Sequence, residues 1–184
     1  AGTATMGGLI IVPAVLVSTL LFARLDHFHV WLVVAATAWM AVVGFIDDLL
    51  KLRGSKRGLI PRYKLIGQVT LGLLIGGTLY FFPDLLSPEF ANSKALSTVP
   101  FFKYLFINFA PFGIGAAFIL MVVIVETGTS NAVNLTDGLD GLAIGIVGIM
   151  SSAFAALCWV SGNAIFADYL NIIYLPVSGE LTIY

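Results

Sequence analysis

Charged residues are scarce in this sequence: Asp, Glu, Lys and Arg make up 10% of its 184 residues, whereas 59% are hydrophobic. Soluble domains carry about 25% charged residues, so this composition cannot cover a water-facing surface. The net charge of −1 lacks the basic excess that phosphate backbones attract, which argues for no nucleic-acid partner. A single cysteine, Cys158, excludes an internal disulfide. These absences predict a membrane protein, with the lipid bilayer as its solvent.

Long uncharged stretches are what the sequence has instead. A helix needs roughly 20 mostly apolar residues to cross the hydrocarbon layer. Five stretches suit such a span, and a sixth begins after Glu180. We therefore predict an all-α fold, a polytopic transmembrane helical bundle that forms a single domain over residues 1–184. The five predicted spans are residues 6–23, 30–46, 65–82, 113–125 and 142–167.

The basic residues predict the orientation of these spans. Six of the nine Lys and Arg residues fall between positions 51 and 64, in the loop after the second span. Lys and Arg accumulate in cytoplasmic loops, so this loop should face the cytoplasm. Counting spans from there brings three polar or glycine-rich segments to the same side. They are TATMGG (3–8), DDLLK (47–51) and NAVNLTDGLDG (131–141).

Asp47 and Asp48 stand side by side at the inner end of an apolar span. The helix macrodipole disfavours carboxylates at a C-terminus, so a solvated helix end explains the pair poorly. Paired carboxylates beside a phosphate substrate suit a bound Mg²⁺, or one of them can act as a general base. We predict a functional role for both, either as ligands of the metal or with one of them as the base. Lys51 either pairs with them or offers a cation to a phosphate.

A second polar run follows the fourth span. A capped loop explains Asn and Asp in a turn, but not four such residues at regular three-residue intervals. Polar groups at membrane depth are functional candidates, so we predict a functional role for the run. Its members are Asn131, Asn134, Asp137 and Asp140.

Thr5, Gly7 and Gly8 open the first span. Glycines allow a backbone to approach either a phosphate or another helix. Both readings stay open, with helix packing favoured.

The segments TATMGG, GFIDDLLK and SNAVNLTDGLDGLA resemble, in order and in approximate spacing, motifs of the phospho-MurNAc-pentapeptide transferases. These enzymes belong to the polyprenyl-phosphate N-acetylhexosamine-1-phosphate transferase superfamily. The resemblance implies transfer of phospho-MurNAc-pentapeptide from UDP-MurNAc-pentapeptide to undecaprenyl phosphate. The products would be lipid I and UMP, in bacterial peptidoglycan synthesis.

The resemblance also implies a Mg²⁺ cofactor and ten transmembrane helices in the bacterial cytoplasmic (inner) membrane, with the active site facing the cytoplasm. By this resemblance Asp47 and Asp48 match the catalytic pair. Lys51 and the run from Asn131 to Asp140 match the nucleotide side of the cleft.

Two departures from the family pattern matter. Ala4 stands where the family has proline, and the family's later half, with a third Mg²⁺-binding aspartate and a histidine-rich loop, has no counterpart here. We therefore expect about half of such an enzyme, inactive by itself. Whether it forms a homodimer is left open.

Two other functions stay open. A UDP-GlcNAc:polyprenyl-phosphate GlcNAc-1-phosphate transferase would share the aspartate pair and a similar polar run. A cation-coupled transporter would fit the topology, but transporters bind near mid-membrane, whereas these carboxylates stand at helix ends.

Overall fold

The structure is a computed structural model that describes residues 7–54, 58–86, 88–93, 96–98, 105–108, 115–137, 141–176 and 178–179. Within these ranges, four helices are long and apolar enough to cross a membrane. This confirms the prediction of an all-α transmembrane bundle. The four are α2 (Phe28–Leu52), α3 (Pro61–Phe81), α5 (Ala116–Thr136) and α6 (Leu142–Ser161).

Among the described residues, the helix of the first predicted span is too short to cross the hydrocarbon layer. Helix α1 (Gly8–Phe22) is apolar and has 15 residues. At 1.5 Å per residue it is about 22 Å long, against a hydrocarbon layer of about 30 Å. Pro13 lies inside this helix and removes one backbone hydrogen bond from it.

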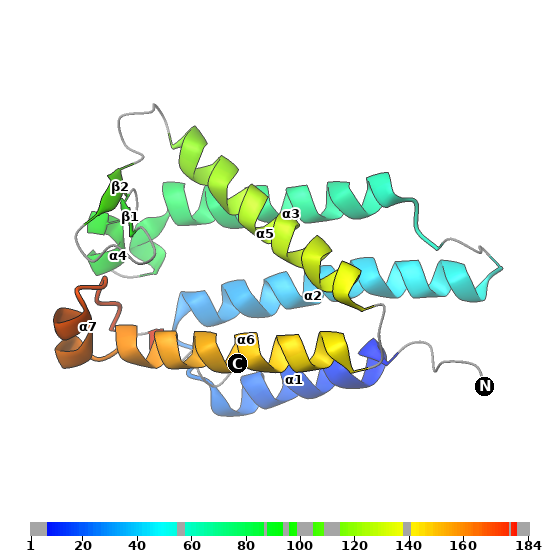
Figure 1. Ribbon diagram of the computed structural model, residues 1–184, viewed down its shortest axis with the longest axis horizontal. Helices are drawn as coiled ribbons and strands as arrows, with labels where there is room; N and C mark the ends of the chain where they lie inside the picture. The colour runs from blue at the N-terminus through cyan, green and yellow to red at the C-terminus, as the bar shows by residue number, and fades with distance from the viewer. Residues whose placement is uncertain are drawn as a thin grey trace.

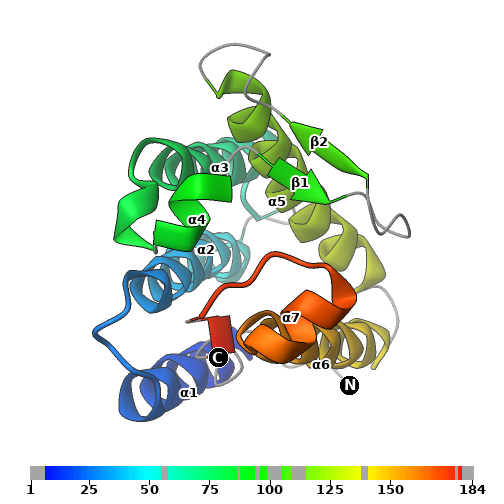
Figure 2. The same cartoon turned by 90° about the vertical axis from the view of Figure 1, so that its left-hand side faces the viewer.

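The long helices form an arc in the order α1, α2, α3, α5, α6, each in contact with the next. Seen end-on, α1, α2 and α3 lie along one side, and α5 and α6 along the other (Figure 2). In Figure 1, the starts of α1, α3 and α6 and the ends of α2 and α5 point toward the same end of the bundle. The chain thus alternates in direction from span to span, as the span count predicts.

Two glycines of α3 set its close contact with α5. A Cβ at Gly72 would lie 2.9 Å from the Cα of Val123, and one at Gly76 would lie 3.2 Å from the Cα of Ile119. Small residues one turn apart let two helix backbones approach closely, which is how helices associate in lipid, where hydrophobic burial contributes little. Helix α6 differs, because none of its residues is buried.

Several boundaries differ from those predicted. Helix α5 continues past residue 125 to Thr136, so the first part of the polar run is helical. The stretch 142–167 divides at Gly162 into α6 and α7 (Ala164–Leu170), because the Asn163 side chain accepts hydrogen bonds from the backbone of Ile165 and Phe166 and starts a new helix.

Short elements occupy the described parts of the long connection between α3 and α5. They include an antiparallel two-stranded ribbon, which the all-α prediction did not include and in which Ser97 lies opposite Ile107. The elements are η1 (Pro83–Leu85), α4 (Pro88–Ser93), β1 (Leu96–Thr98) and β2 (Phe106–Asn108). In Figure 1 they lie at the end of the bundle opposite the DDLLK segment.

Candidate active site

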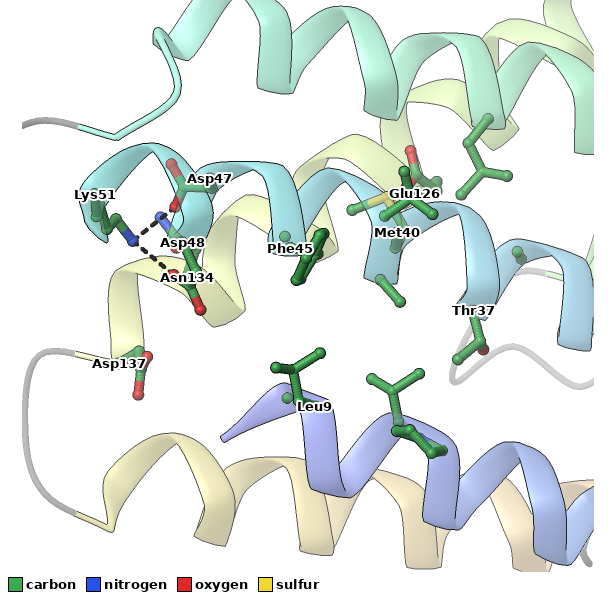
Figure 3. Close-up of a pocket in the computed structure, with 18 of the residues that line it drawn as sticks. Leu9, Thr37, Met40, Phe45, Asp47, Asp48, Lys51, Glu126, Asn134 and Asp137 are labelled. Carbon is green, nitrogen blue, oxygen red and sulfur yellow. Dashed lines mark hydrogen bonds and ion pairs between the residues drawn. The ribbon is translucent and has the colours of Figure 1, made fainter. Parts of the chain in front are cut away.

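A cavity of about 910 Å³ lies inside the arc, lined by residues of α1, α2, α3 and α5 together with Asp137, which caps α5. Most of its wall is apolar and comes from α1 and α2. In Figure 3 most of the polar side chains gather toward one end of the cavity, and Glu126 stands apart, near Met40. The charged and amide side chains in the lining are Asp47, Asp48, Lys51, Glu126, Asn134 and Asp137.

Asp47 is nearly enclosed by hydrogen-bond donors. Its carboxylate lies 2.7 Å from Lys51 Nζ and 2.9 Å from Lys64 Nζ, and it accepts a 2.7 Å hydrogen bond from the backbone N–H of Leu59. Only 8% of its side chain is exposed. Burying a carboxylate is costly unless it is paired, and here three donors from different parts of the chain pair it. Asp47 therefore ties the end of α2 to the start of α3.

Gly58 makes this arrangement possible. Its φ of +64° lies in the left-handed region that side chains disfavour. A Cβ at this position would lie 2.5 Å from Asp47 Oδ1. The glycine therefore lets the backbone turn back against the carboxylate, so that the N–H of Leu59 can reach it.

Asp48 has a different environment although it is the next residue. Its side chain is 36% exposed, and Lys51 Nζ lies 3.2 Å from its Oδ1. Successive helical residues point about 100° apart, so one carboxylate faces the loop and α3 while the other is half-exposed at the cavity. The two aspartates, whose individual roles the sequence leaves open, are thus distinguished by their partners.

The polar run divides between two places. Asn134 and Asp137 line the cavity. Asn131 instead donates a 2.9 Å hydrogen bond from Nδ2 to Gln68 Oε1 on α3, and the same Nδ2 donates to the carbonyl of Thr127. The structure therefore places Asn131 at the α3–α5 contact, while Asp140 lies outside the described residues.

The glycines at the start of α1 have open surroundings. Gly8 lines the cavity, and a Cβ added at Gly7 or Gly8 would meet nothing within 4 Å. Neither glycine is therefore explained by tight packing within the described part of the chain. Thr5 lies outside that part.

Sequence reasoning did not assign a site role to Lys64, Gln68 or Glu126. Lys64 had been assigned to the cytoplasmic basic loop, and nothing in the sequence links it to Asp47. Gln68 carried a usable signal, because it is an amide within an otherwise apolar span. Glu126 had the same signal and lines the cavity.

The described residues contain no group of three His, Cys, Asp or Glu side chains placed to hold a metal ion. The donors at the polar end of the cavity are nevertheless of the kind Mg²⁺ prefers, since carboxylate and amide oxygens are hard ligands. Asp47 is engaged by two lysines and a backbone N–H. Asp48, Asn134 and Asp137 are therefore the better candidates for metal contact from this chain.

Fold and site together define a class: a multi-pass helical membrane protein with a mostly apolar cavity that bears carboxylates at one end. The sequence model of Glycosyl transferase family 4 matches residues 30–181, and the chain belongs to this family. Membership in a transferase family argues against the transporter alternative.

Curated relatives are similar over nearly the whole chain. The phospho-N-acetylmuramoyl-pentapeptide-transferase of Chlorobium limicola is 48% identical over 180 residues, covering 97% of this chain and 46% of the relative. Proteins of the same name from Chlorobium phaeobacteroides and Salinibacter ruber are 46% and 44% identical, with 46% and 49% of their lengths covered. The chain thus spans about half the length of the curated relatives it matches.

Proposed function

We propose that the protein containing this chain transfers phospho-MurNAc-pentapeptide from UDP-MurNAc-pentapeptide to undecaprenyl phosphate. An oxygen of the acceptor phosphate attacks the sugar-bearing phosphorus of the donor, the bond from that phosphorus to UMP breaks, and UMP and lipid I are the products. The relatives' shared name supports this reaction. The observation that carries the proposal is one cavity that joins a half-exposed aspartate and lysine on α2 to the polar run of α5.

The reaction brings two anions together, so the site must offset their repulsion. Lys51 supplies positive charge at the cavity. Mg²⁺, when bound, would offset phosphate charge and favour departure of UMP. On this chain Asp48 and Asp137, with the amide oxygen of Asn134, would hold it. Asp47 keeps Lys51 and Lys64 in place.

The acceptor carries a long apolar chain, and the cavity wall suits such a molecule. Residues of α1 and α2 such as Leu9, Val12 and Met40 continue from the polar end as an apolar wall. A lipid phosphate could thus keep its head at the polar end and its tail against apolar side chains. We propose the bacterial cytoplasmic membrane as the location, with the site facing the cytoplasm, because basic residues concentrate beside the polar end.

The test measures UMP release by the full-length enzyme in detergent with Mg²⁺ and undecaprenyl phosphate. UDP-MurNAc-pentapeptide and UDP-GlcNAc are compared as donors at equal concentration. We expect release from the muramyl donor and at most background release from UDP-GlcNAc. Release from UDP-GlcNAc alone would identify the GlcNAc-1-phosphate transferase instead, and release from neither would refute the proposal.

A further inference from the structure

Gln68 is a buried amide within an apolar helix, and two residues of α5 form hydrogen bonds with its side chain. Its Nε2 donates a 2.9 Å hydrogen bond to Ser130 Oγ, and its Oε1 accepts a 2.9 Å hydrogen bond from Asn131 Nδ2. Only 6% of the residue is exposed. An amide in an apolar environment is costly unless its donor and acceptor are both satisfied, and here two adjacent residues of α5 satisfy them.

Residues next to Gln68 connect α3 to α2. The carbonyl of Gly67 accepts a 3.0 Å hydrogen bond from Trp39 Nε1, and Lys64, one turn earlier on α3, binds Asp47. Polar contacts from little more than one turn of α3 therefore reach both α2, which carries the aspartate pair, and α5, which carries the start of the polar run.

The geometry fixes the position of α5 along its axis. A slide of α5 by one residue would move Ser130 and Asn131 by about 1.5 Å and turn them by about 100°, which breaks both hydrogen bonds to Gln68. Asn134 follows Asn131 on α5 by about one turn, and Asp137 caps the same helix about one turn later. Their placement at the cavity therefore depends on the register that Gln68 holds.

We propose that Gln68 is a positioning residue: its paired hydrogen bonds to Ser130 and Asn131 hold Asn134 and Asp137 in register with Asp48 across the cavity. Asn131, which the resemblance matches to the nucleotide side of the cleft, instead helps to hold α5 in place by its hydrogen bond to Gln68. The inference rests on the proposed function for its kinetic readout, but the helix contact itself can be tested without it.

The experiment uses the full-length enzyme with Gln68→Leu, Asn131→Leu and the double variant. Ser152→Ala is the matched control, because the Ser152 hydroxyl donates to the carbonyl of Gly148 on its own helix, α6, rather than to a residue of another described helix. Three quantities are measured: the thermal midpoint in detergent, and kcat and KM for the UDP donor and the lipid acceptor separately.

We expect Gln68→Leu to raise the donor KM about tenfold and to leave the acceptor KM within about twofold, because only the α5 side of the site is displaced. The double variant should be no worse than the worse single variant in KM and in midpoint, since both substitutions remove one shared contact. Gln68→Glu, which keeps an acceptor for Asn131, should recover most of the donor affinity. Ser152→Ala should match the wild type.

Three results would overturn the inference: an unchanged donor KM in Gln68→Leu, equal rises in both KM values, or additive losses in the double variant. If Gln68→Leu does not fold, Ser130→Ala removes only one of the two bonds and should raise the donor KM about threefold, with wild-type KM counting against the inference. A wild-type enzyme that releases no UMP would refute the proposed function alone, because coupling of Gln68 and Asn131 in the thermal midpoints would still be measurable.

Discussion

Lys64 of α3 lies 2.9 Å from the Asp47 carboxylate of α2, and Lys51 lies 2.7 Å from the same oxygen. Lys51 lies near the end of α2 and Lys64 near the start of α3, so the Asp47 carboxylate joins the two sides of the connection between these helices. Asp47 therefore organises the loop, and Asp48 is left half-exposed beside the cavity with Lys51 as its cation.

This division predicts different effects for two similar substitutions. Asp47→Asn and Asp48→Asn should each lower turnover at least about 100-fold, the first because Lys51 loses the carboxylate that places it and the second because the site loses a metal-binding carboxylate. Asp47→Asn should also lower the free energy of unfolding by about 2 kcal/mol, because two lysines lose a buried partner. Asp48→Asn should leave the thermal midpoint near that of the wild type. Kinetics and thermal unfolding of the same preparations check this.

Asp26→Asn is the control for the aspartate pair. Asp26 forms an exposed ion pair with Arg24, at the far end of α1, and such pairs contribute little. The activity and the thermal midpoint of the Asp26→Asn variant should match those of the wild type. Equal midpoints for the Asp47 and Asp48 variants would contradict the distinction between them.

Gly58→Ala should be more harmful than Gly54→Ala. Both glycines have positive φ, +64° and +96°, so each alanine should cost about 1–2 kcal/mol of backbone strain. A Cβ at Gly54 meets nothing within 4 Å, whereas one at Gly58 lies 2.5 Å from Asp47 Oδ1. Thermal midpoints and UMP release should show activity lost in Gly58→Ala and largely kept in Gly54→Ala. Equal losses would mean that strain alone explains both.

Gly72→Ala should separate α3 from α5. Its Cβ would lie 2.9 Å from the Cα of Val123, a backbone atom that cannot rotate away. We expect a loss of about 1–3 kcal/mol from overpacking. Gly77→Ala on the same helix meets nothing within 4 Å and should be neutral or slightly stabilising. Comparison of the two midpoints in detergent is the measurement, and a stable Gly72→Ala protein would contradict the close contact.

Labelling of single cysteines in intact bacteria can test the proposed orientation. In a Cys158→Ala background, Arg53→Cys lies at the end of α2 near the polar cavity, and Asp26→Cys lies in the opposite connection. A membrane-impermeant maleimide should label Asp26→Cys in whole cells and Arg53→Cys only after lysis. The reverse pattern would place the cavity outside the cell.

Much of the fold could be predicted because lipid imposes simple rules. Uncharged length predicts spans, and their alternation places the aspartate pair and the polar run toward one end. Helix ends were less predictable. Helix α5 extends beyond its apolar part to include Asn131 and Asn134, and the hydrogen bond from Asn131 to Gln68 of α3 supports a polar residue that hydropathy treats as loop.

The division of labour within the site could not be read from the sequence. Asp47 and Asp48 are identical and adjacent, and their difference depends on a loop that turns at Gly58 and returns Leu59 and Lys64 to one of them. Likewise, three-residue spacing turns successive side chains by about 300°, so the polar run turns from α3 at Asn131 to the cavity at Asn134 and Asp137. The packing of the neighbouring helix decides which of them reaches the cavity.

The glycine seam between α3 and α5 bears on how the protein is assembled. Helices insert into the bilayer one by one and then associate through close packing and hydrogen bonds between them. Gly72 and Gly76 let α3 pack closely against α5, and Gln68 adds hydrogen bonds between the two helices. Helix α6, by contrast, has no buried residue. We therefore expect α3 and α5 to pair early during biogenesis, with α6 recruited later. If either α3 or α5 failed to insert, the first helix pair could not form. We expect the unassembled chain to be degraded by membrane quality-control proteases.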